Sequence, residues 1–97
     1  MDVTELSRRA ARKLAEQYRI QIYEIKTKLE QTKHDLDDAY TCFNDATDPG
    51  LIDESIYRIN ELEARYSRLI GVAREKDLAM KSALDASKKK HRSEERI

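Results

Sequence analysis

Residues 45–50 of the chain read Asp-Ala-Thr-Asp-Pro-Gly, and this stretch decides the fold. It contains the only proline and one of the two glycines, whereas no helix breaker occurs between Thr4 and this stretch. Asp48 followed by Pro49 is typical of a helix start, because Asp caps the free N–H groups and Pro fits the first helical position without losing a hydrogen bond. The stretch therefore predicts a loop at 45–49 between two long helices.

Before this loop, apolar residues recur at alternating steps of four and three. Such spacing keeps one face of a helix against a partner, and its persistence from residue 11 to residue 43 is typical of a coiled coil or a helical bundle. We therefore predict a first helix at about 4–44. Its seam residues are Ala11, Ala15, Tyr18, Ile22, Ile25, Leu29, Thr32, Leu36, Ala39 and Phe43.

After the loop, a second helix is predicted at about 50–87. Its apolar stripe weakens after Ala73, because Lys76 occupies the next seam position. Gly71 costs about 1 kcal/mol relative to Ala but does not end so well patterned a helix. Residues 88–97 have no apolar residue before Ile97 and are expected to form a basic, disordered tail. The predicted seam residues are Ile52, Ile56, Ile59, Leu62, Tyr66, Leu69, Ala73, Met80 and Ala83, and Ile70 widens the face.

Two helices joined by a short loop must fold back antiparallel. The predicted fold over residues 1–87 is therefore all-α, a coiled-coil-like two-helix hairpin. A single hairpin leaves much of each apolar stripe exposed, and two hairpins paired as a four-helix bundle would cover it. We expect a homodimer. The predicted interface residues are Ile22, Ile25, Leu29, Leu36, Phe43, Ile56, Ile59, Leu62, Tyr66 and Leu69.

The charges are distributed unevenly although the net charge is zero. Residues 34–63 carry a net charge of −8, whereas residues 64–97 carry +5 and residues 1–19 carry +2. A hairpin would thus have an acidic tip and a basic open end, and clustered basic residues can neutralise phosphates. No aromatic residue interleaves the lysines, and Glu94 and Glu95 follow at once. The candidate phosphate contacts are Lys88, Lys89, Lys90 and Arg92.

Composition excludes several classes of protein. With 39% charged residues, the chain has little material for a thick core. A single cysteine, Cys42, excludes an intramolecular disulfide. No apolar run reaches the roughly 18 residues that span a bilayer, and the N-terminus lacks the apolar stretch of a signal peptide. We therefore expect a cytoplasmic protein without a transmembrane segment.

The residues that carry chemistry do not form a recognisable site. His34 and His91 lie far apart in the sequence, so a helical zinc site is not expected. Cys42 flanks the seam and is expected to be an inert thiol. The acidic residues near the loop lack the spacing of a calcium loop, and the two glycines stand apart at 50 and 71, which excludes a phosphate loop. We predict no catalytic, cofactor or metal site, no small-molecule substrate and no enzyme activity.

Three apolar residues fall outside the predicted seam. The helical spacing places Ile20 and Tyr23 on the outer face of the first helix and Tyr57 on the outer face of the second. Single exposed apolar residues are ordinary, but tyrosine is favoured in interface hot spots. We therefore take Tyr57, Ile20 and Tyr23 as candidate contacts with a protein partner.

Residues 43–76 read FNDATDPGLIDESIYRINELEARYSRLIGVAREK, and this stretch resembles the YaaL family, a small bacterial domain of unknown function found in Firmicutes. The resemblance implies a cytoplasmic bacterial protein with no known enzymatic activity. This chain departs from the family pattern at Gly71 and Val72 and in its basic extension beyond Lys76. The residues that carry the likeness are Asp48, Pro49, Leu51, Ile52, Asp53, Ile56, Tyr57, Asn60, Glu63, Arg65, Tyr66, Leu69 and Ala73.

These patterns predict a non-enzymatic helical interaction or adaptor protein that acts through pairing of helix faces. It would pair first with itself and then with a protein partner that the sequence does not identify. The alternative is a small nucleic-acid-associated protein that uses the basic open end. Nucleic-acid affinity would fall steeply between about 50 and 200 mM salt, whereas an apolar helix contact would hardly respond.

Overall fold

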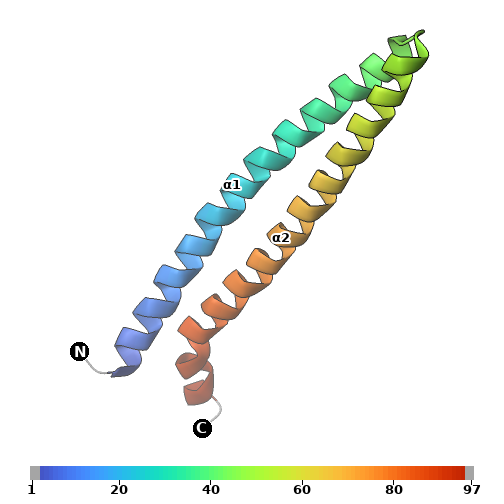
Figure 1. Cartoon of the computed structure of the whole chain (residues 1–97). Coiled ribbons are helices and arrows are strands. Elements are labelled where there is room, and N and C mark those ends of the chain that lie inside the picture. Colours follow the sequence, from blue (N-terminus) through green and yellow to red (C-terminus); the bar gives the residue numbers. More distant parts are fainter. Residues whose placement is uncertain (1–2, 96–97) are drawn as a thin grey trace. The chain divides into compact units, whose positions relative to one another are not determined.

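The computed structural model describes the backbone of residues 3–95 and the side chains of residues 7–87. It contains two helices, α1 (Val3–Asp45) and α2 (Pro49–Glu95), and the described residues include no strand (Figure 1). The helices pack against each other, which confirms the all-α two-helix hairpin.

The helix boundaries lie close to the predicted ones at the loop and further out at the C-terminal end. α1 ends at Asp45 and α2 begins at Pro49, while the far end of α2 is at Glu95 rather than near residue 87. The sequence has neither Gly nor Pro after Gly71, and its many Lys, Arg, Glu and Ala residues favour helix. The side chains of the predicted basic tail, residues 88–97, lie outside the described part.

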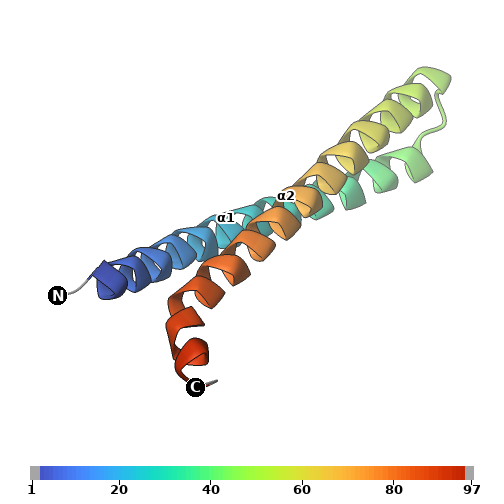
Figure 2. The same ribbon diagram turned by 90° about the horizontal axis from the view of Figure 1, so that it is seen from below.

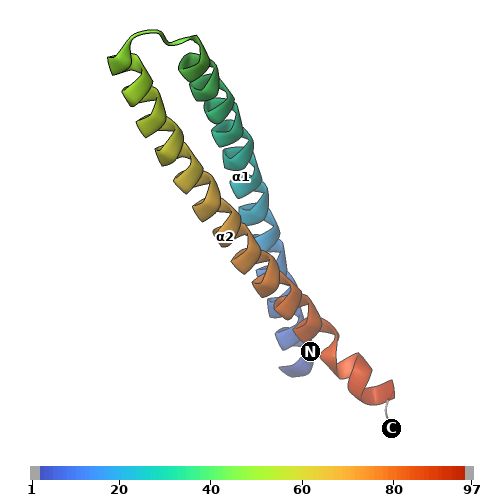
Figure 3. The ribbon, with the colours of Figure 1, turned by 90° about the vertical axis from the view of Figure 1, so that its right-hand side faces the viewer.

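Asp48 caps α2 as predicted. Its Oδ2 atom accepts a hydrogen bond from the Leu51 backbone N–H at 3.2 Å, and its carbonyl accepts one from Ile52 at 3.0 Å. A Cβ atom at Gly50 would lie 3.1 Å from the same Oδ2 atom, so a side chain there would crowd the cap. Figure 3 shows the short link that this cap terminates. The cap fixes where α2 begins and therefore how its residues face α1.

The chain divides into two compact units, each containing part of both helices. The tip unit comprises residues 25–72, and the open-end unit comprises residues 1–24 and 73–97. Within the tip unit α1 and α2 run antiparallel, side by side (Figures 1 and 3). The N-terminal end of α1 and the C-terminal end of α2 both belong to the open-end unit (Figure 2).

The core of the tip unit is thin. Ala39, Ile59 and Leu62 form a buried cluster, against which Leu36 and Phe43 pack. Every predicted seam residue of α1 is buried or half-buried, so the heptad register of α1 is confirmed. Even so, no large side chain within residues 7–87 is fully buried. Two helices alone therefore leave substantial apolar area in contact with water.

The seam of α2 differs from the prediction at one position. Ile56 is 43% exposed, whereas the neighbouring Ser55 is only 9% exposed and faces α1. Steps of three and four residues that alternate regularly from Ile52 lead to Ser55 and then to Ile59. Because each residue turns the helix by about 100°, Ser55 lies about 20° around the helix from the buried Leu62, whereas Ile56 lies about 120° from it. Register therefore determines burial here, although Ile56 is the more apolar of the two residues.

The open-end unit has its own small core and one polar layer. Ala15 of α1 and Ala83 of α2 are buried. Lys76, at the weak seam position, is half-buried, and its Nζ atom lies 5.7 Å from the centre of the Tyr18 ring. This distance fits a cation–π contact, which is worth about 0.5–1 kcal/mol at an exposed site. Lys76 thus continues the seam through its contact with an aromatic ring.

Candidate interaction surface

The seam of the tip unit has two unlike sides. On the first side, three residues each follow a large seam residue by four positions and so share its face: Tyr40, Ile56 and Ile70. Tyr40 and Ile56 are each 43% exposed, and the others are half-buried. We call this surface the apolar side. Its residues are Leu36, Tyr40, Phe43, Ile52, Ile56, Tyr66 and Ile70.

A polar bridge joins the two helices on the apolar side. The Tyr40 hydroxyl donates a hydrogen bond to Glu63 Oε1 at 2.6 Å. This hydrogen bond, followed by desolvation and the Glu63 charge, raises the pKa of Tyr40 above its ordinary value of 10.0. The bridge shows that Tyr40 of α1 and Glu63 of α2 flank the same side of the seam.

On the opposite side, small seam residues leave the seam unfilled. Thr32, Ala39 and Ser55 are all buried, and their side chains are small. Two hollows lie along this side, with volumes of about 370 and 260 Å³. We call them together the tip groove. The larger hollow is lined by Lys28, Gln31, Thr32, Asp35, Arg65 and Leu69, and the smaller by Asp38, Ala39, Cys42, Leu51, Glu54, Ser55 and Arg58.

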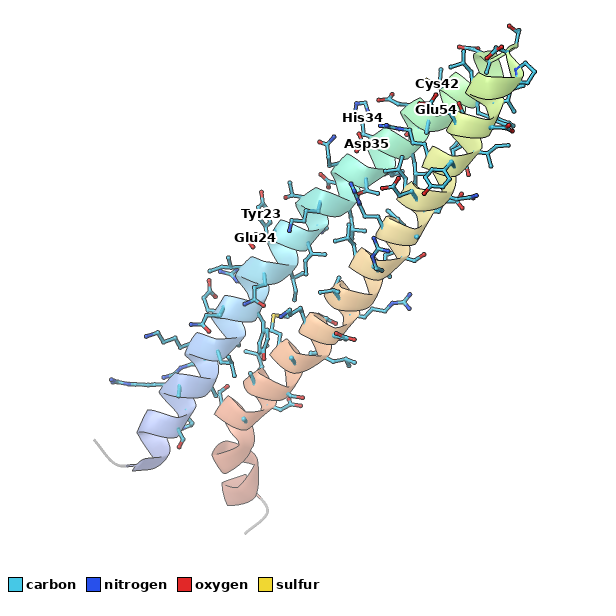
Figure 4. All side chains as sticks on the ribbon, viewed as in Figure 1. Tyr23, Glu24, His34, Asp35, Cys42 and Glu54 are labelled. Carbon is cyan, nitrogen blue, oxygen red and sulfur yellow. The ribbon has the colours of Figure 1, made fainter. Side chains whose placement is uncertain are left out.

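The charges of the tip groove change along its length. The smaller hollow, nearer the loop, has two carboxylates, Asp38 and Glu54, and one cation, Arg58. The larger hollow has two cations, Lys28 and Arg65, and one carboxylate, Asp35. Figure 4 shows Cys42 of α1 and Glu54 of α2 near the loop, with Asp35 further along α1. The groove is therefore net acidic toward the loop and net basic away from it.

Ser55 forms part of the floor of the smaller hollow. Its side chain is nine-tenths buried, yet its hydroxyl makes no hydrogen bond to any described residue. The buried Thr32, in contrast, donates a hydrogen bond to the Lys28 carbonyl oxygen at 2.8 Å. The Ser55 hydroxyl oxygen is nevertheless accessible to water, because the buried polar side-chain atoms without a partner among the described residues are Arg8 Nε and Gln21 Oε1.

The predicted interface residues lie in the seam between the helices, except Ile56, which lies on the apolar side. Their part in a dimer stays a prediction. The outward positions of the candidate partner contacts are confirmed, with exposures of 52% for Ile20, 72% for Tyr23 and 75% for Tyr57. The candidate phosphate contacts Lys88, Lys89, Lys90 and Arg92 lie outside the described side chains.

His34 has a carboxylate partner that the sequence reasoning missed. Its Nδ1 atom lies 3.4 Å from Asp38 Oδ2 on the next turn of α1. A hydrogen bond with its own backbone, followed by the Asp38 charge, raises the pKa of His34 above its ordinary value of 6.5. The spacing of four residues was the signal that could have revealed the pair. Within the described residues, no group of three or more potential ligands is arranged to hold a metal ion.

Comparison with known proteins gives a family without an assigned activity. A family model described as a protein of unknown function, DUF2508, matches residues 7–80. The chain belongs to this family. The match includes the whole tip unit and much of α1, a wider range than the residues 43–76 that suggested a family likeness. No curated protein and no solved structure matches the chain.

The family range 7–80 includes both the apolar side and the tip groove, whereas the basic segment from Lys88 lies beyond it. Over the described residues, neither helix has a stretch long and apolar enough to cross a membrane. Both sides of the tip-unit seam therefore lie within the part of the chain that matches the family.

Proposed function

We propose that the chain is a non-enzymatic helical interaction module that pairs with a second copy through the apolar side. The observation that supports this most directly is the exposure of Ile56 beside six other apolar or aromatic residues on one side of a two-helix hairpin. The proposal includes a cytoplasmic location and membership of the YaaL family, which the likeness of residues 43–76 supports.

The apolar side can supply the free energy of pairing. Covering the exposed part of one of these side chains, which is less than half of its surface, is worth up to about 1 kcal/mol. Seven such residues on each of two copies then contribute up to about 14 kcal/mol, against an association cost of about 4–15 kcal/mol. An association cost of about 6 kcal/mol, in the lower part of that range, leaves about 8 kcal/mol, which corresponds to micromolar affinity. Two hairpins paired in this way form a four-helix bundle.

The test is light scattering of the full chain from about 10 to 200 μM, with two neighbouring variants. Ile56→Asp places a carboxylate on the apolar side and should give a monomer that keeps its helical circular dichroism, because a buried unpaired charge costs several kcal/mol. Tyr57→Asp is the matched control and should leave the dimer intact, because Tyr57 is 75% exposed on the outer face. A wild-type chain that stays monomeric at 200 μM would contradict the proposal.

A further inference from the structure

The apolar side has its centre near the bridge between Tyr40 and Glu63. It extends over residues 36–43 of α1 and residues 52–70 of α2, toward the loop and away from it. Two copies that pair through the same side are related by a twofold axis. An axis along the hairpin gives a parallel pair, with the two loops side by side. An axis across the hairpin, near the bridge, gives an antiparallel pair that covers the same residues.

The charges of the tip unit distinguish these two arrangements. Its acidic end, residues 42–59, contains four carboxylates and one arginine and has a net charge of −3. Its basic end, residues 25–33 and 68–72, contains four cations and one carboxylate and has a net charge of +3. The charged side chains of both ends are exposed. We infer that the two copies pair antiparallel, with the acidic end of each beside the basic end of the other, and this inference rests on the proposed pairing through the apolar side.

The middle of the tip unit does not select an arrangement. Residues 34–41 and 60–67 surround the bridge and contain five carboxylates and one arginine. Because these residues lie close to the axis across the hairpin, they meet the same residues of the second copy in both arrangements. Their mutual repulsion weakens the two pairs equally, so only the two ends differ.

The ends favour the antiparallel pair by about tenfold. Packed helix axes are about 8–10 Å apart and exposed charges lie farther out, so the ends of paired copies face each other at about 15 Å. A parallel pair places −3 against −3 and +3 against +3, whereas an antiparallel pair places −3 against +3 twice. Coulomb's law in water, screened over a Debye length of about 8 Å, converts this difference into a ratio of about ten. At about 1 M salt the Debye length is about 3 Å, and the ratio should approach one.

The same charges favour a second copy as the occupant of the apolar side. A copy of the tip unit has one end of each sign, and in the antiparallel orientation each end meets the opposite sign. A partner with one sign of charge along its whole length would meet like charge at one end, and like charges across an interface select against it.

Distances between spin labels test the arrangement. Thr47 of the loop and Gln31 of α1 are exposed and uncharged, so Thr47→Cys or Gln31→Cys in a Cys42→Ser chain leaves the net charge unchanged. The two residues lie on opposite sides of Tyr40, so the axis across the hairpin brings residue 47 of one copy beside residue 31 of the other. The two residues 31 are then about 27 Å apart along the bundle, at about 1.5 Å per residue. In the parallel pair the two residues 31 lie side by side instead.

Double electron–electron resonance should therefore give the shortest distance only when chains labelled at residue 47 are mixed with chains labelled at residue 31. Two triple variants then test the cause. The first neutralises three exposed carboxylates of the acidic end and should lower the antiparallel preference to about twofold. The second neutralises three exposed carboxylates of the middle and should leave the preference at about tenfold. The substitutions are Asp45→Asn, Asp53→Asn and Glu54→Gln in the first variant, and Asp37→Asn, Asp38→Asn and Glu61→Gln in the second.

Three results would overturn the antiparallel inference while leaving the pairing itself intact. They are a shorter distance within either singly labelled sample than in the mixed sample, an unchanged ratio at about 1 M salt, and equal effects of the two triple variants. Light scattering of the same samples separates this inference from the proposed function. A chain that stays monomeric at about 200 μM would overturn pairing through the apolar side, and the antiparallel arrangement with it.

Discussion

Truncation of Leu62 and of Ile56 to alanine should have different effects on folding and on pairing. Leu62 is 6% exposed in the buried cluster with Ala39 and Ile59, whereas Ile56 is 43% exposed on the apolar side. Leu62→Ala removes packing inside the hairpin. Ile56→Ala removes surface that, in our proposal, becomes buried only when two copies meet.

The magnitudes follow from burial. Leu→Ala at a buried site costs about 2–5 kcal/mol, and about 2–3 is expected for Leu62, because a two-helix unit can partly close around the lost atoms. Ile56→Ala should cost about 1 kcal/mol in the isolated chain, because nearly half of the side chain is already exposed. Against a total free energy of unfolding of about 5–15 kcal/mol, the difference between the two variants is measurable.

The assay is urea denaturation followed by circular dichroism at about 1 and 100 μM chain. The cost of Leu62→Ala should be the same at both concentrations, whereas the cost of Ile56→Ala should increase at 100 μM, where pairing adds to the stability of the native state. Equal costs for the two variants at 1 μM would refute the seam register argued from Ser55. A cost for Ile56→Ala that does not depend on concentration would refute pairing through the apolar side.

Two further predictions concern polar contacts. Nuclear magnetic resonance should give a pKa for His34 above 6.5, and Asp38→Asn should lower this pKa. Because the folded-state pKa is raised, the stability that His34 contributes is present at low pH and is lost as the pH rises through that pKa. An unchanged pKa of His34 in the Asp38→Asn variant would exclude the Asp38 charge as a cause. A double-mutant cycle with Tyr18→Leu and Lys76→Met should give a coupling of about 0.5–1 kcal/mol in the free energy of unfolding, measured by urea denaturation. A coupling of zero would show that the contact between Lys76 and the Tyr18 ring, at 5.7 Å, does not stabilise the fold.

The fold was largely predictable from the sequence because its determinants are local. The Asp48 cap and Pro49 mark the start of α2, and a stripe from Ala11 to Phe43 with steps of three and four specifies the face of α1. Both signals act within a few residues and need no knowledge of distant contacts. The helix beyond residue 87 was missed because loss of the apolar stripe was taken as the end of the helix, although charged residues such as Lys and Glu also favour helix.

The candidate surfaces were less predictable, because they depend on what packing leaves exposed. The apolarity of Ile56 favoured it for the seam, but its regular position is taken by Ser55, and this exchange puts an isoleucine on the surface and a serine inside. No sequence motif predicts the tip groove, because an alanine or threonine at a seam position indicates only a small core residue. Its volume depends on the side chains of both helices together.

The alternation of large and small seam residues on α1 gives the two sides of the tip unit different properties. Leu29, Leu36 and Phe43 alternate with Thr32 and Ala39. Successive seam residues point slightly to either side of the line of contact between the helices. The large residues therefore fill space on one side, and the small residues leave hollows on the other. A hairpin with uniform leucine at these positions would have two similar sides and could pair through either. The observed alternation places most of the large apolar seam residues on one side and the hollows on the other, so the two sides of one short unit differ in chemistry.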